Sequence, residues 1–206
     1  MLRSVSILVF VMAGFGLATP LSAQRTVRVG VGVVPALNRT VDLGIEVGNG
    51  KDLEFFGQVG YMLNARQDDS RYPEGYSWRE SSGSFLKIGG RLTSDQSKRW
   101  RVFGGPQLTG SVLKQGGSFF GYSIQCCCIP CPQPPPVISS ETLGLFAVGG
   151  SAGVSVQVMK RLEVDLGVEL NKVLTGEDRL LQPDAYKPGI GSTPFQALLN
   201  VQYRIK

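Results

Sequence analysis

The chain has 206 residues, a formal net charge of +5 and no histidine, which excludes catalysis or metal binding through imidazole. Its positive charge is modest and its basic residues are scattered, so no nucleic-acid partner is predicted. The 27 glycines are many and the charged fraction of 18% is small for this length. Such a composition suits strands and turns better than helices.

The first 23 residues have the pattern of a secretory signal peptide. One positive charge, Arg3, precedes an apolar run over residues 5–17, and Ala23 offers a small residue for cleavage. The alternative is an uncleaved membrane anchor, but this run is shorter than the roughly 20 residues that a spanning helix needs. We therefore expect cleavage after Ala23 and a mature barrel domain of residues 24–206 with a net charge of +4.

After residue 25, apolar and polar residues alternate with a period of two in eight stretches, and no long stretch has the 3.6-residue period of an amphipathic helix. This pattern predicts an all-β fold. Asn49-Gly50 fits a tight hairpin turn, whereas Pro106 weakens the middle of the fifth stretch. The predicted strands cover residues 26–33, 40–48, 52–64, 84–93, 99–113, 142–158, 161–170 and 194–205.

The connections between these strands differ in length in a regular way. Those after the second, fourth and sixth strands are short, at residues 48–51, 94–98 and 159–160. Those after the third, fifth and seventh strands are long, at residues 65–83, 114–140 and 173–192, and only the connection at 35–39 breaks the pattern. Short turns on one side and long loops on the other are expected of an outer-membrane β-barrel, with the turns in the periplasm.

Alternation alone does not separate a membrane barrel from a soluble one. The polar faces favour the membrane barrel, because their small and charged residues fit the narrow inside of eight strands. The predicted strands also match the roughly 9 to 11 residues that a tilted membrane crossing needs. The alternatives are a soluble periplasmic β-barrel that binds a small apolar ligand, and a membrane-embedded enzyme. We find no arrangement of nucleophile and base, no metal site and no cofactor motif, and we expect no enzyme.

Eleven charged residues fall on the polar faces, with the acids on the second, third and seventh strands and the bases on the first, fourth, fifth and eighth. Because buried charges need partners, we expect these side chains to pair in the lumen and to leave no wide aqueous pore. The predicted polar network consists of Asp42, Glu46, Glu54, Glu163, Asp165 and Glu169 with Arg28, Lys87, Arg91, Arg101 and Arg204.

A cysteine- and proline-rich stretch lies in the second long loop. Disulfides are the default in an exported protein. Zinc is a weaker alternative, because the crowded thiols lack the two paired arms of a structural zinc site, and free or intermolecular thiols are a third. The cysteines of this expected disulfide loop are Cys126, Cys127, Cys128 and Cys131.

Over residues 25–206 the chain resembles the small eight-stranded outer-membrane barrels of the OmpA and OmpX type. The resemblance rests on the alternation, on the order of turns and loops, and on a closing segment with Val201, Tyr203 and Ile205, although Lys206 stands where such barrels usually have an aromatic residue. It implies an up-and-down transmembrane barrel in the bacterial outer membrane, surrounded by lipid. A structural or surface-interaction role would then belong to the outward loops, which would contact any surface partner.

Overall fold

The computed structural model describes residues 26–37, 39–48, 52–68, 76–94, 99–119, 137–176, 180 and 186–205. Within them, eight strands form one closed barrel in which each strand pairs with the next and β8 pairs with β1. All pairs are antiparallel, so the predicted fold class is confirmed. The predicted signal peptide, residues 1–23, and the four cysteines lie outside the described residues.

The eight strands and one short helix follow one another along the chain. None of the described helical segments is long and apolar enough to cross a membrane. The elements are β1 (Thr26–Gly32), α2 (Val33–Leu37), β2 (Thr40–Gly48), β3 (Leu53–Asp68), β4 (Tyr76–Thr93), β5 (Trp100–Phe119), β6 (Val137–Met159), β7 (Leu162–Thr175) and β8 (Phe195–Arg204).

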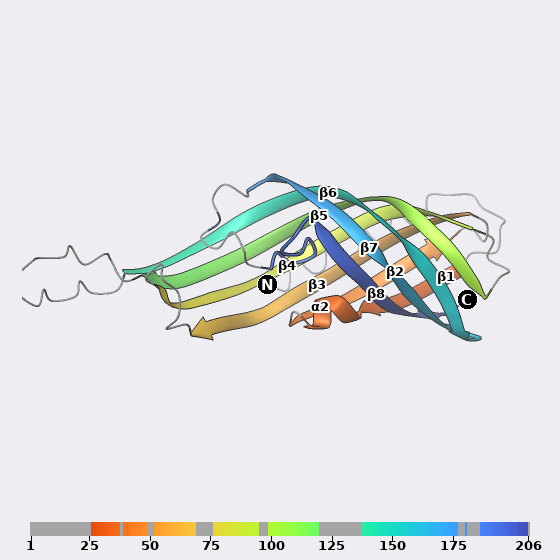
Figure 1. Cartoon of the computed structure of the whole chain (residues 1–206), viewed down its shortest axis with the longest axis horizontal. Coiled ribbons are helices and arrows are strands. Elements are labelled where there is room, and N and C mark those ends of the chain that lie inside the picture. Colours follow the sequence, from red (N-terminus) through yellow and green to blue (C-terminus); the bar gives the residue numbers. More distant parts are fainter. Residues whose placement is uncertain are drawn as a thin grey trace, which may run out of the picture.

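The strands from β3 to β7 are longer than the sequence predicts. β4 begins eight residues before the expected position 84, and β5 and β6 continue through positions 114–119 and 137–141. Figure 1 shows β3 to β6 continuing to the left beyond the rest of the barrel. These extensions are rich in serine and glycine, as at residues 81–84 and 116–118, so they pair without the apolar alternation that predicts a strand.

Two connections also differ from prediction. α2 overlaps the expected loop at 35–39 and begins at Val33, the last residue of the predicted first strand. Pro35 lies in the first turn of α2, where its missing N–H breaks no helical hydrogen bond. The expected loop at 173–192 begins only after Thr175, and its described residues 186–191 fold back against the barrel wall.

Pro106 lies inside β5 without ending it. Pro106 pairs with Gly150 of β6. On the β4 side it has no paired position, because the register of β4 goes directly from Gly89 to Leu92. The two backbones approach closely here, because a Cβ on Gly105 would lie 2.0 Å from the carbonyl oxygen of Gly90. The proline thus interrupts one ladder locally, and a glycine beside it allows the close approach.

Burial in this barrel is inverted relative to a soluble protein. Among the described residues, 22 polar or charged side chains are buried against 10 apolar ones, whereas charged residues are seldom buried in soluble proteins. Large apolar side chains are exposed on every strand. They include Val31, Leu43, Phe55, Leu92, Val102, Phe146, Val168 and Phe195.

Candidate functional site

The polar faces of the eight strands meet in the lumen, which is the candidate functional site. We call the barrel end with the short connections the turn side and the opposite end the loop side. Of the eleven charged residues predicted for the polar network, ten are buried and only Arg204 is partly exposed, with 28% of its side chain accessible. They form two groups, one near the turn side and one nearer the middle.

Arg28 lies at the centre of the turn-side group. Its Nη1 contacts Glu54 Oε1 at 2.7 Å and Glu46 Oε1 at 3.2 Å, and its Nε lies 3.0 Å from Glu163 Oε2. The Arg28 side chain is 1% exposed. One guanidinium from β1 therefore joins carboxylates from β2, β3 and β7.

Glu163 collects three arginines. Besides Arg28, it accepts Arg101 Nη2 at 2.6 Å and a hydrogen bond from Arg204 Nη2. Arg101 also reaches Glu54 Oε1 at 2.9 Å through its Nη1. The charge-assisted contacts of Arg101 cross the lumen from β5 to β3 and β7, whereas Arg204 reaches Glu163 from the neighbouring strand β8.

Arg91 is held by aromatic rings as well as by carboxylates. Its Nη1 lies 3.1 Å from Asp165 and 3.4 Å from Glu46. Its guanidinium carbon also lies 4.5 Å from the ring centroid of Phe56 and 4.6 Å from that of Phe103. Desolvated cation–π contacts of this kind contribute up to about 2 kcal/mol. Phe56, which interrupts the polar face of its strand in the sequence, is thus a lumen residue.

These contacts define an ion network with equal numbers of the two charges. Four arginines face four carboxylates, so the formal charges cancel, which is what a desolvated cluster requires. Gln202 Nε2 ties two of the acids together with hydrogen bonds of 2.9 Å to Glu46 and to Asp165. The ion network consists of Arg28, Arg91, Arg101, Arg204, Glu46, Glu54, Glu163 and Asp165.

The remaining predicted charges lie nearer the middle of the barrel. Lys87 Nζ pairs with Glu169 Oε2 at 2.7 Å. Asp42 accepts a hydrogen bond of 2.5 Å from the backbone N–H of Gly32. The structure adds one buried cation that the sequence analysis missed, Lys187, which belongs to the β7–β8 connection. The alternation of inward and outward positions along a strand cannot assign Lys187 to the lumen, because this residue lies outside any strand.

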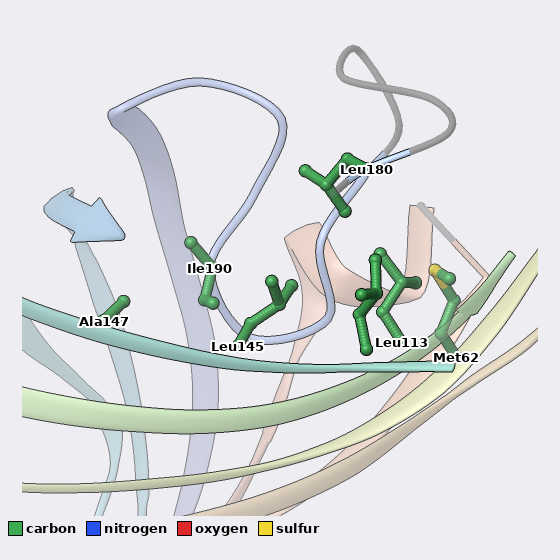
Figure 2. Packing of buried hydrophobic residues seen from close by; sticks show 7 residues of the cluster. Met62, Leu113, Leu145, Ala147, Leu180 and Ile190 are labelled. Carbon is green, nitrogen blue, oxygen red and sulfur yellow. The ribbon is translucent and has the colours of Figure 1, made fainter. Parts of the chain in front are cut away.

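An apolar layer closes the loop side of the lumen. Leu180 and Ile190 of the β7–β8 connection pack against inward-facing side chains of β3, β5 and β6, and Figure 2 shows this cluster between the connection and the strands. We call Leu180 and residues 186–191 the plug. The wall residues of the cluster are Met62, Leu113, Leu143, Leu145 and Ala147.

Polar contacts and one glycine fix the plug in position. Asn171 on β7 donates a hydrogen bond of 3.2 Å to the carbonyl of Ile190 and accepts one of 2.9 Å from Gln107 on β5. Gly189 has a φ of 71°, and a Cβ there would lie 2.5 Å from the ring of Phe85. The apolar residues at inward positions are the sequence signal that could have revealed this layer.

Tyr186 joins the plug to the start of β8. Its hydroxyl accepts a hydrogen bond of 3.2 Å from Gln196 Nε2. Burial raises the pKa of Tyr186 to about 12, so the hydroxyl stays protonated at neutral pH.

Two cavities of the described lumen are small. One of about 30 Å³ lies beside Arg28, Glu46 and Arg91, and one of about 10 Å³ lies between Lys87 and Tyr186. These volumes hold roughly two water molecules and one water molecule, respectively. No group of three or more potential metal ligands occurs in the described part of the chain. The arrangement is therefore a filled, salt-bridged interior.

No protein-family model matches the sequence, and no curated protein is significantly similar to it. Several solved structures are similar to this chain at low scores. A major outer membrane protein from Thermus thermophilus has 13% identity and a TM-score of 0.45, over 88% of this chain and 98% of that one. For Ail, the attachment invasion locus protein of Yersinia pestis, the identity is 11% and the TM-score 0.42, over 88% and 97%.

The N-terminal β-barrel domain of Pseudomonas aeruginosa OprF has 9% identity and a TM-score of 0.41, over 88% of this chain and 96% of that domain. Scores and identities this low carry no argument about this chain. The fold assignment therefore rests on the strand pairing of the chain itself, which closes an eight-stranded antiparallel barrel around a charged lumen.

Proposed function

We propose that this chain is an integral, non-enzymatic β-barrel of a bacterial outer membrane, closed along its axis and used as a scaffold for surface interactions. The observation that carries the proposal is the belt of exposed apolar side chains on all eight strands around a charged interior. Water would solvate such a belt poorly, whereas the hydrocarbon of a bilayer matches it. A closed barrel also satisfies every strand edge at that depth.

The height of the belt supports the membrane assignment. On β5, exposed apolar residues run from Trp100 to Val112 and give way to the exposed Lys114. Thirteen residues at about 3.3 Å each, tilted by roughly 40°, span about 33 Å. That length covers the bilayer hydrocarbon. The same belt argues against a soluble periplasmic barrel, which would turn these side chains inward around an apolar ligand.

The filled lumen supports a scaffold rather than a channel. The ion network crosses the barrel near the turn side and the plug covers the loop side, so two layers stand in series. This is why we infer that the barrel acts through its surface.

The projecting part of β3 to β6 supports a surface role. The 20 residues of β5 extend about 50 Å along the barrel axis by the same geometry, roughly one and a half times the height of the apolar belt on that strand. The hairpin of β5 and β6 therefore raises its connection well above the lipid headgroups. A platform of this height presents the loop-side connections to molecules outside the cell.

Membrane fractionation tests the assignment. The chain is expressed with residues 1–23 in a Gram-negative host, and the inner and outer membranes are separated on a density gradient. We expect the protein in the outer-membrane fraction, resistant to carbonate extraction, and faster on a gel before boiling than after it. Recovery from the periplasmic supernatant without detergent would overturn the proposal.

A protease added to intact cells tests the surface role. We expect cleavage within the β5–β6 connection, residues 120–136, while the barrel stays protected. Protection of this connection in intact cells, together with cleavage in lysed cells, would place the projecting sheet on the periplasmic side and contradict the proposed orientation.

A further inference from the structure

The turn side of the barrel carries an arginine fixed against the outer wall. Arg161, in the turn between β6 and β7, donates a hydrogen bond of 3.3 Å from its Nη1 to the hydroxyl of Tyr203 on β8. Both side chains are exposed, and Tyr203 stands opposite Leu162 in the strand register. The guanidinium therefore lies where the apolar belt ends, and only one of its five N–H groups is used by Tyr203.

Two further exposed cations adjoin Arg161. The backbone N–H of Gln157 donates to the carbonyl of Arg99 at 2.7 Å, and the Gln157 side chain donates to the carbonyl of Lys160 at 3.1 Å. One residue of β6 thus ties the start of β5 to the β6–β7 turn. We call Arg99, Lys160 and Arg161 the basic rim.

No described acidic side chain offsets the basic rim. Glu163, the nearest acid along the chain, is buried and already paired with arginines of the ion network. Asp52 is exposed, but it lies just before β3, two strands from β5 and three from β6. The basic rim therefore presents uncompensated positive charge on the β5 to β8 side of the barrel.

Exposed aromatic and apolar side chains border the basic rim towards the belt. Trp100, which is 60% exposed, follows Arg99 on β5, and Met159, which is 66% exposed, precedes Lys160. Aromatic residues at this height anchor barrels at the membrane interface. A ligand of the basic rim would therefore meet charge at one end and an apolar wall at the other.

We propose that the basic rim binds the phosphate headgroups of anionic phospholipids in the leaflet at the turn side. Guanidinium and ammonium groups are the side chains that bind phosphate. Basic residues next to an apolar surface also favour anionic lipid. A dissolved anion would not use Trp100 and Tyr203, whereas a lipid places its acyl chains on them. The inference rests on the proposed membrane location and adds the lipid class.

Tryptophan quenching by brominated lipid tests the proposal in the full chain. The sequence contains two tryptophans, Trp78 and Trp100, so Trp78→Phe leaves Trp100 at the basic rim as the only reporter. The barrel is reconstituted in phosphatidylcholine vesicles that contain one fifth brominated phosphatidylglycerol or, in parallel, one fifth brominated phosphatidylcholine. The ratio of the two quenching constants measures the local enrichment of the anionic lipid.

We expect a ratio of roughly three or more, falling towards one in high salt, because screening weakens exposed charges. Replacing all three residues of the basic rim, by Arg99→Gln, Lys160→Gln and Arg161→Gln, should bring the ratio to one. The matched control, Lys114→Gln with Lys172→Gln, removes exposed cations of β5 and β7 outside the rim and should leave the ratio unchanged.

The three ways in which the experiment can fail are distinguishable. Equal quenching by the two lipids in a barrel that resists heat unfolding would overturn the lipid proposal and leave the membrane assignment intact. Absence of quenching by either brominated lipid would mean that Trp100 does not touch acyl chains, and would overturn both. A ratio above one that persists in the triple variant would assign the preference to another surface and refute the role of the basic rim.

Discussion

At the scale of single residues, Glu163 is the carboxylate of the ion network that contacts three arginines. Its carboxylate faces Arg28, Arg101 and Arg204 and is 2% exposed. Such a group stabilises the fold through its partners, because removing its charge leaves the two desolvated guanidinium groups of Arg28 and Arg101, and the partly exposed one of Arg204, without a shared carboxylate.

We expect Glu163→Gln to lower the free energy of unfolding by about 3 to 5 kcal/mol. The measurement is urea unfolding of the barrel in lipid vesicles, followed by tryptophan fluorescence. As a control, Glu80→Gln changes a carboxylate that accepts an exposed hydrogen bond from Asn64 and should shift stability by less than about 0.5 kcal/mol. Equal shifts for the two variants would show that the ion network does not stabilise the barrel.

The pair of Lys87 and Glu169 allows a double-mutant cycle. We expect Lys87→Met and Glu169→Leu each to cost about 3 to 5 kcal/mol, because each leaves one buried charge unpaired. The double variant should lie within about 2 kcal/mol of the wild type, since it removes both charges at once. Additive losses in the double variant would mean that the two side chains act independently.

Strand parity predicts which charged residues face the lumen, but it does not predict their partners. Arg91 and Asp165 meet across strands that are far apart in the sequence, and that meeting depends on how far neighbouring strands are shifted when the barrel closes. Phe56 is unpredictable for a second reason. An aromatic residue on a polar face interrupts the alternation, and the sequence does not indicate that the guanidinium of Arg91 stacks on it.

At the scale of elements, β5 contains two glycines with opposite surroundings. A Cβ at Gly105 would lie 2.0 Å from a backbone oxygen of β4, whereas a Cβ at Gly110 would meet nothing within 4 Å. We expect Gly105→Ala to destabilise the barrel by about 1 to 3 kcal/mol through overpacking. Gly110→Ala should be neutral or slightly stabilising. Thermal unfolding in detergent compares them, and equal melting temperatures would refute the close approach of β4 and β5.

Removing apolar packing between the plug and the barrel wall should also lower the stability. Ile190 is 3% exposed within the apolar cluster, so Ile190→Ala should cost about 2 to 5 kcal/mol if the plug unfolds with the barrel. Limited proteolysis reveals whether the plug alone is released: new cleavage within residues 177–192, with an intact barrel, is then expected. Unchanged stability and unchanged cleavage would mean that the plug does not pack against the barrel wall.

The number of strands is predictable because the apolar belt imposes alternation on every membrane crossing. The ends on the loop side are not predictable, because Ser81, Gly116 and their neighbours lie outside the belt, where nothing requires every second residue to be apolar. The plug is not predictable either, because it also lies outside the alternating part of the chain. A segment without regular structure has no period, and its burial depends on the wall it meets.

At the scale of the whole molecule, the ion network and the plug predict that the barrel does not conduct ions. We expect no stepwise conductance when the barrel is added to a planar bilayer, because neither cavity holds more than a few water molecules. Deletion of residues 177–192 should also give no conductance, since the ion network still crosses the lumen. Channel openings in the deletion variant alone would show that the plug is the sole barrier.

The ion network has a consequence for how the barrel assembles. Gln202 on β8, which donates to Glu46 on β2, is 156 residues away from it in the sequence. This contact needs β1 to meet β8, and so does the contact of Arg28 with Glu163. Pairs on neighbouring strands, such as Arg28 with Glu46, can form earlier, so only part of the inner charge remains unpaired until the last seam closes. A hairpin inserted alone would turn bare carboxylates and guanidinium groups towards lipid. Assembly should therefore be concerted, with a slow closing step and no stable half-inserted intermediate.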